Sequence, residues 1–90
     1  MKLVITVIGC DRVGIIAGVS KILADNNINI LSINQTILEG IFNMVMMCES
    51  GDDGSTLDVL QAQLKALAEE LGVEILAQHA EIFISMHRVG

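Results

Sequence analysis

The sequence predicts an α+β fold whose strands and helices follow the order βαββαβ. Four apolar, mostly β-branched runs have the length of strands, two segments repeat apolar residues at helical spacing, and glycine-containing turns separate them. Right-handed crossovers fold this order into a four-stranded antiparallel sheet with both helices on one face. We therefore expect a single domain over residues 1–90, with a core spanning residues 3–79 and a C-terminal tail at 80–90.

The first strand, the first turn and the first helix follow one another at the N-terminus. Leu3–Ile8 is β-branched and is predicted to be a strand that ends at Gly9. The first helix is predicted from Gly14 to Asn26, with Gly18 permitting a close approach to the sheet and Asn26-Asn27 forming a left-handed stop. Its apolar positions recur at helical spacing: Ile15, Ile16, Val19, Ile22 and Leu23.

A hairpin is predicted in the middle of the chain. Ile28–Leu38 and Ile41–Glu49 are strand-like, and Glu39-Gly40 between them has the composition of a tight turn. Strict alternation along the first strand places Ile28, Ile30 and Thr36 on one face and Leu31, Ile33 and Ile37 on the other. Alternation along the second places Phe42, Met44, Met46 and Cys48 together.

The second half of the chain repeats the helix–strand pattern after a Gly- and Asp-rich loop. Ser55 is predicted to cap a helix that ends at Gly72, and Val73–His79 is predicted to be the fourth strand. Ala80–Arg88 is predicted to be a short helix that presents Ile82, Phe83 and Met86. The leucines of the preceding helix form one stripe that packs on the sheet: Leu57, Leu60, Leu64, Leu67 and Leu71.

Apolar residues occur on both faces of every predicted strand. The chain is 52% hydrophobic and 2% aromatic, and a sheet with one solvated face alternates more cleanly than this. A domain of this size also buries only about 60–65% of the surface of its unfolded chain. We therefore expect a homo-oligomer, at least a dimer, in which a second subunit covers the helix-free face, a sheet edge or both, with help from the tail.

Charge and composition exclude several classes of function. Five basic and eleven acidic side chains give a net charge of −6, which argues against direct nucleic acid binding. Cys10 and Cys48 are expected to be free thiols, no run approaches the length of a membrane span, and a cytoplasmic, non-membrane protein is expected. His79 and His87 lack further ligands in a metal-binding pattern. We expect no metal, no cofactor and no catalytic residues.

The turn Gly9–Ile15 is the candidate binding site. It joins a strand to a helix N-terminus, where unpaired N–H groups and the helix dipole favour an anion. Asp11 is either the helix N-cap or an acceptor for the ammonium group of an amino acid, and Arg12 is either a solvated charge or a carboxylate clamp. Asn29 opens the next strand, at the mouth of the same turn or facing it from a second subunit. Its amide serves either backbone groups or a ligand.

These residues resemble the ACT domain. The resemblance lies in Ile5-Thr6-Val7, Gly9-x-Asp11-Arg12-x-Gly14-Ile15-x-Ala17, Leu23-Ala24-x-x-Asn27-Ile28-Asn29-Ile30 and Gln35. It extends through the last strand, and it is nearest to stand-alone ACT proteins that are similar to the halves of the glycine cleavage system regulator.

The resemblance implies a ferredoxin-like fold, dimers made by pairing domains, and amino-acid sites between them. Asp11 and Asn29 match positions where the family places ligand contacts, so the implied ligand-binding set is Asp11, Arg12, Val13, Gly14, Ile15 and Asn29. Val13 replaces a common Pro, and Gly9 stands where some serine-binding members have His, so serine specificity does not carry over.

Three functions are compatible with the sequence. The first is a non-catalytic regulatory module that binds an amino acid at a homodimer interface. The second is a ligand-free interaction module that docks a partner protein through its sheet edges. The third and weakest is an acylphosphatase-like hydrolase, whose first-loop signature requires an Arg beyond Gly14 that this chain lacks.

Overall fold

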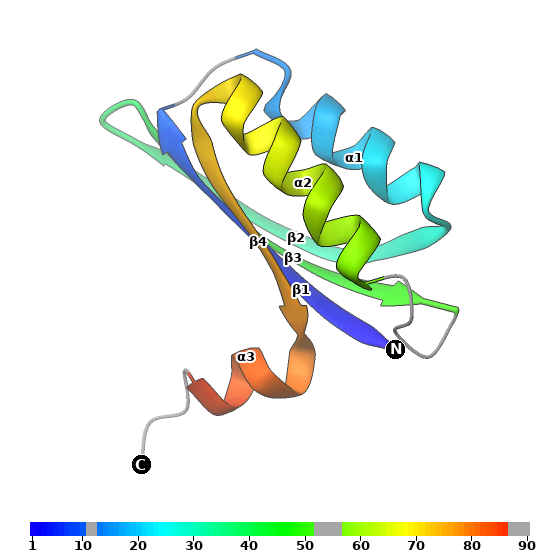
Figure 1. Cartoon of the computed structure of the whole chain (residues 1–90). Coiled ribbons are helices and arrows are strands. Elements are labelled where there is room, and N and C mark those ends of the chain that lie inside the picture. The colour runs from blue at the N-terminus through cyan, green and yellow to red at the C-terminus, as the bar shows by residue number, and fades with distance from the viewer. Residues whose placement is uncertain (11–12, 52–56, 87–90) are drawn as a thin grey trace.

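A four-stranded antiparallel sheet carries two helices on one face in the computed structural model, which describes residues 1–10, 13–51 and 57–86 (Figure 1). The strand order is β2-β3-β1-β4, so β2 and β4 are the edge strands. The predicted βαββαβ ferredoxin-like fold is confirmed, with one further helix at its end. The elements are β1 (Lys2–Cys10), α1 (Ile15–Asp25), β2 (Ile28–Leu38), β3 (Ile41–Ser50), α2 (Leu57–Leu71), β4 (Val73–His79) and α3 (Ala80–Met86).

Several predicted boundaries are confirmed by the backbone. The β2–β3 hairpin turns at Glu39 and Gly40, which both have positive φ, 52° and 80°, as the tight hairpin turn requires. Helix α1 ends at Asp25, and the left-handed stop is Asn27, with φ of 58°, whereas Asn26 keeps a negative φ. The predicted capping residue of the second helix, Ser55, lies outside the described residues.

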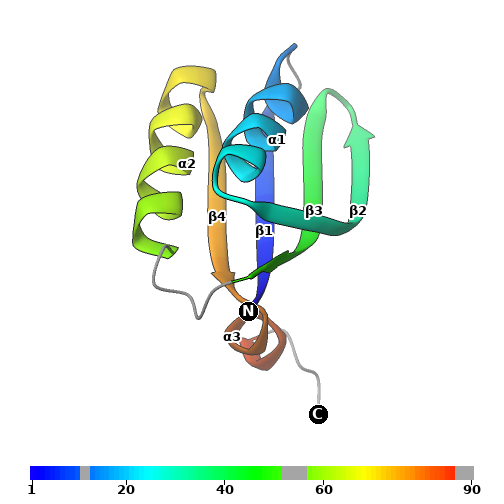
Figure 2. The same cartoon turned by 90° about the vertical axis from the view of Figure 1, so that its right-hand side faces the viewer.

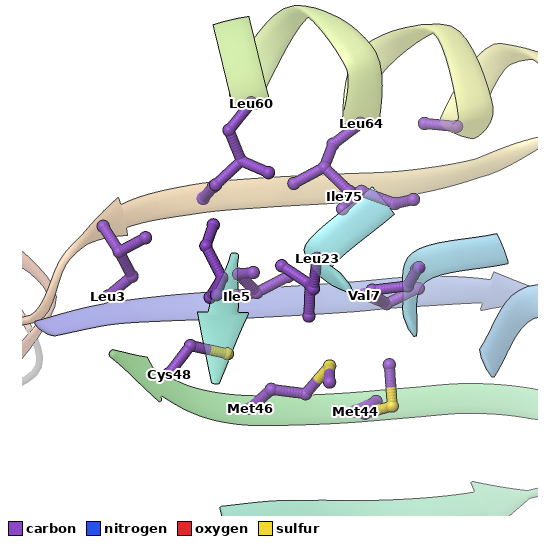
Figure 3. Close-up of a cluster of buried hydrophobic side chains, with 14 of the residues drawn as sticks. Leu3, Ile5, Val7, Leu23, Met44, Met46, Cys48, Leu60, Leu64 and Ile75 are labelled. Carbon is purple, nitrogen blue, oxygen red and sulfur yellow. The ribbon is translucent and has the colours of Figure 1, made fainter. Parts of the chain in front are cut away.

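The core lies between the sheet and the two helices (Figure 3). Helix α2 contributes Leu60 and Leu64, both 1% exposed, from the predicted leucine stripe. The remaining three leucines of that stripe are half-buried at the border of the core. The sheet supplies inward-facing rows from its two central strands: Leu3, Ile5 and Val7 of β1, and Phe42, Met44, Met46 and Cys48 of β3.

Gly18 brings α1 close to α2 and not, as predicted, close to the sheet. A Cβ atom on Gly18 would lie 3.0 Å from both methyl groups of Leu67. The helices are also joined at the end of α1, where the Asn26 side-chain amide donates to Gln63 Oε1 at 2.7 Å. The prediction was wrong because sequence spacing does not show which neighbour fills the space above a helical glycine.

A bulge at Leu31 overturns the predicted faces of β2. The register with β3 shifts between Ile30 and Ser32, so Leu31 is an extra residue without a partner. Because one extra residue reverses the alternation, Ile33 pairs with buried Met46 and lies on the same face as Ile30. The helix-side row is therefore Ile28, Ile30, Ile33, Gln35 and Ile37, and Thr36 faces the other way.

Helix α3 covers one corner of the helix-free face, which is the side of the sheet opposite α1 and α2. It packs against β1 and β4 (Figure 1). Val4 faces this side, yet it is only 1% exposed. The prediction that the tail helps to cover this face is supported at this corner. On this short helix, Ile82 is exposed and Phe83 is half-buried. His87 lies outside the described residues.

The buried Cys48 thiol should make stability fall at alkaline pH. Burial raises its pKa from 9.0 to about 11, so between these pH values the unfolded chain releases the proton first. The free energy of unfolding should then drop by about 1 kcal/mol per pH unit. Urea denaturation across this interval measures the slope, and a Cys48→Ala variant is the control. An equal slope in both proteins would show that Cys48 is not responsible.

Candidate functional site

The turn after β1 lies at the end of the sheet formed by Gly9 and Cys10. Gly9 is paired with Phe42 on β3 and with Val73 on β4. A Cβ atom at Gly9 would lie 2.7 Å from Val73 Cγ1, so only glycine fits between the strands at this point. The strands therefore pack tightly up to the last residue before the turn, which fixes where the turn begins.

Gly14 is the N-cap of α1 and sets the shape of the turn. Its φ is +97°, a conformation that side chains rarely adopt, and the amide of Gly18 donates to its carbonyl at 2.9 Å. A Cβ atom added to Gly14 would meet no heavy atom within 4 Å. Gly14 is thus needed for its backbone conformation, and no atom of the described residues beyond its chain neighbours fills the space beside it.

The N-terminus of α1 is not neutralised by the described part of its own chain. No side chain caps it by a hydrogen bond, and its first turn contains no acidic residue. Helix α2 differs, because Asp58 lies in its first turn. Among the described residues, no side chain occupies the first N–H groups of α1, which together with the positive end of the helix dipole suit an anion such as a carboxylate.

The predicted site residues differ in how they are placed. Asp11 and Arg12 lie outside the described residues. Val13 is 98% exposed beside the turn. Ile15 is 2% exposed and belongs to the core, so its side chain anchors α1 and only its backbone faces the first helical turn.

Asn29 lies at the opposite end of the sheet from the turn. It pairs with Glu49, which pairs with Lys2 at the start of β1, whereas the turn follows Cys10 at the end of β1. Within one chain, the expectation that Asn29 lies at the mouth of the turn is therefore wrong. The reason is that α1 runs back along the sheet, so the strand that follows it starts at the far end. The other expectation, that Asn29 serves a second subunit, requires a partner chain.

Exposed apolar residues on β2 were not singled out from the sequence. Figure 2 shows that α1 and α2 stand over the other strands and leave the outer part of β2 uncovered. Ile33 is 48% exposed and Ile37 is 52% exposed, although both face the helix side of the sheet. Every residue from Leu31 to Leu38 is exposed. The signal in the sequence was the excess of apolar residues in this strand, which the bulge concentrates on one face.

Metal and membrane sites receive no support from the described residues. Among residues 1–10, 13–51 and 57–86, no three His, Cys, Asp or Glu side chains gather as metal ligands. No helix in the same part of the chain is both long and apolar enough to cross a bilayer.

Comparison with known proteins identifies relatives along nearly the whole chain. The family model for the ACT domain matches residues 1–78. A UPF0237 protein of Methanocaldococcus jannaschii is 46% identical over 88 residues, which cover 98% of each protein. An ACT domain protein from Streptococcus pneumoniae has a solved structure with a TM-score of 0.80 at 36% identity, covering 100% of this chain and 98% of that one.

A protein assigned as a glycine cleavage system transcriptional repressor shares the fold. Its solved structure gives a TM-score of 0.71 at 23% identity, over 86% of this chain and 44% of that chain. The likeness to half of such a protein is thereby confirmed for the fold.

Proposed function

Since the chain belongs to the ACT-domain proteins of the UPF0237 family, we propose that it is a non-catalytic regulatory module that binds an amino acid between two copies of itself. ACT domains typically act as regulatory modules for small ligands. The observation that carries the proposal is the separation of Asn29 from the turn. The two halves of the predicted site lie at opposite ends of one sheet, and a two-fold arrangement of two chains reunites them.

The outer edge of β2 is the surface that supports such a dimer. It is an edge strand with no pairing beyond β3 among the described residues, and it exposes Ile33 and Ile37. Unpaired edges of this kind favour pairing with another chain. A two-fold axis near Ile33 would pair β2 antiparallel with the β2 of a second copy. Such a contact is isologous, the type found in two-fold symmetric dimers.

This pairing places Asn29 beside the far end of β2 in the second copy. That end is Leu38, which pairs with Ile41 on β3. Ile41 in turn pairs with Cys10, the last residue of β1 before the turn, so Leu38 and the turn lie at the same end of the sheet. Asn29 from one copy and the turn from the other then lie at the same end of the joined sheet. Each dimer contains two such sites, and neither site is complete in one chain.

The chemistry of the two halves fits an amino acid. The N–H groups at the start of α1 suit its carboxylate, and the open space beside Gly14 admits it. Asp11 is proposed to accept the ammonium group, and Asn29 of the second copy both donates and accepts. A ligand held by both copies favours one quaternary arrangement by its difference in affinity, which is the basis of regulation.

A thermal-shift screen against the twenty amino acids tests this function. Binding stabilises the folded dimer by about 2.7 kcal/mol at 100-fold excess over Kd, so the right ligand should raise the melting temperature by several degrees. The Asp11→Ala and Asn29→Ala variants should each lose the shift. Glu70→Ala, which removes an exposed carboxylate on α2, should keep it.

Sedimentation in the presence of the same ligand completes the test. The ligand should favour the dimer in the natural protein and have no effect on the Asn29→Ala variant. No shift with any amino acid, or a shift that survives both substitutions, would overturn the proposal. Turnover of an acyl phosphate would instead support hydrolysis.

A further inference from the structure

A groove follows the other edge of the sheet, on the side away from β2. It lies between α2 and β4 and has a volume of about 570 Å³. Its floor is apolar and its rim is polar. The floor includes Leu64, Ala68 and Ile75, and the rim includes Gln61, Lys65 and Glu69.

One hydrogen bond shows which backbone groups face this β4 groove. The side-chain amide of Gln61 donates to the carbonyl of Ala77 at 2.8 Å, so that carbonyl points away from β1. Alternate residues of a strand direct their N–H and C=O groups to the same edge. The backbone groups of Val73 and Ile75 therefore face the groove as well, and in the described part of the chain β4 pairs only with β1.

We propose that the β4 groove binds an extended, basic segment of a partner protein, which joins the sheet as a fifth strand. Strand addition takes its affinity from main-chain hydrogen bonds and its specificity from alternate side chains. The backbone groups of Val73 and Ile75 supply the hydrogen bonds. One row of the added side chains lies under α2 on the floor formed by Leu64 and Ala68, so that row is apolar.

The acidic side chains around the groove favour basic residues in the other row of the added strand. Glu74 pairs with Ile8 on the helix-free face and is exposed there, beside the position of the second row. Glu69 lies on the rim, and Lys65 is the one basic side chain among the described residues that line the groove. With a net charge of −6, the whole chain attracts a basic segment and repels an acidic one.

A second copy of this chain is the poorer occupant. Suppose that two β4 strands pair antiparallel and form hydrogen bonds only through the backbones of Val73 and Ile75. Val73 of each copy then lies opposite Ile75 of the other, and the two Glu74 side chains lie directly opposite each other. Like charges in this position destabilise a sheet. Shifting the pairing to centre on Ile75 requires the carbonyl of Ala77, which Gln61 already occupies. The groove thus suits a different chain.

A synthetic peptide tests the proposal directly. The probe is a capped peptide of alternating lysine and valine, as long as the seven residues of β4. Titration into ¹⁵N-labelled full-length protein should shift and protect the amides of Val73 and Ile75 most. The Glu74→Lys variant should bind about tenfold more weakly, which corresponds to about 1.4 kcal/mol. Glu39→Lys makes the same change in net charge at the β2–β3 hairpin, away from the β4 groove, and should weaken binding much less than Glu74→Lys.

Two further peptides separate strand addition from general attraction between charges. A peptide with the same sequence but N-methylated on its bonding edge should fail to bind, and a glutamate–valine peptide should fail as well. The proposal would be overturned if either of these peptides bound as tightly as the lysine–valine peptide. It would also be overturned if the amide shifts centred on β2, or if the lysine–valine peptide did not bind. Dissociation of a dimer by the peptide would also overturn it, because the groove would then be the dimer contact. None of these outcomes depends on whether an amino acid binds at the turn.

Discussion

Replacing Leu64 with alanine is expected to lower the free energy of unfolding by about 2–5 kcal/mol, as large-to-small core substitutions do. Leu64 is 1% exposed and lies between α2 and the sheet, where it also forms part of the floor of the β4 groove (Figure 3). A domain of this kind has a total stability of about 5–15 kcal/mol. The loss is therefore a large share of the whole, and urea denaturation at one fixed protein concentration measures it.

Val59 on the same helix provides the matched control. It is 53% exposed, and alanine is the better helix former, so Val59→Ala should change stability by less than about 0.5 kcal/mol. If the two variants lost the same stability, Leu64 would not be a core residue. A small loss for Leu64→Ala alone would mean that the groove side of the core collapses into the space left by leucine.

Lysine at both Ile33 and Ile37 is expected to separate the homodimer and raise its Kd at least 100-fold, by about 2.7 kcal/mol. Both side chains are about half exposed in the single chain, so lysine reaches solvent there at little cost to folding. In the proposed dimer both positions lie against the second copy, and the two lysines at position 33 would face each other across the two-fold axis. Sedimentation equilibrium over a range of concentrations measures the change.

A lysine at Val59 is the control for this pair, because it adds charge to an exposed apolar site on α2 away from β2. The Val59→Lys variant should remain dimeric. A doubly substituted protein that stays dimeric would place the contact elsewhere on the molecule, with the helix-free face as the next candidate. Loss of the ligand-dependent thermal shift together with the dimer would support a site shared between the two copies.

Local chemistry was sufficient to predict the elements of this fold and their order. The β-branched runs became strands, the Glu39-Gly40 turn closed the hairpin, and β4 begins and ends at the predicted residues. These features depend on neighbours in the sequence. The depth of Leu60 and Leu64 in the core also followed from helical spacing alone.

Features that depend on contacts between distant segments were not predictable in the same way. Leucine is not a residue type that indicates a bulge, so the bulge at Leu31 could not be predicted. Strict alternation therefore assigned the second half of β2 to the wrong face. Nothing near Gly18 identifies Leu67 as its neighbour. At the site, the turn from β1 to the N-terminus of α1 was predicted from the sequence, whereas the separation of the turn from Asn29 follows from the direction of α1 across the sheet.

Gln61 has a consequence for how many copies can join. A dimer paired through β2 has a β4 strand at each end of its joined sheet. If these edges were unprotected, further copies could pair with them and extend the sheet into a fibre. Gln61 closes part of each edge by binding the carbonyl of Ala77, and Glu74 makes pairing with another copy unfavourable. In the proposed dimer, both features oppose the addition of further copies at β4. A single glutamine on a helix surface would then help to keep an apolar, sheet-rich protein from polymerising.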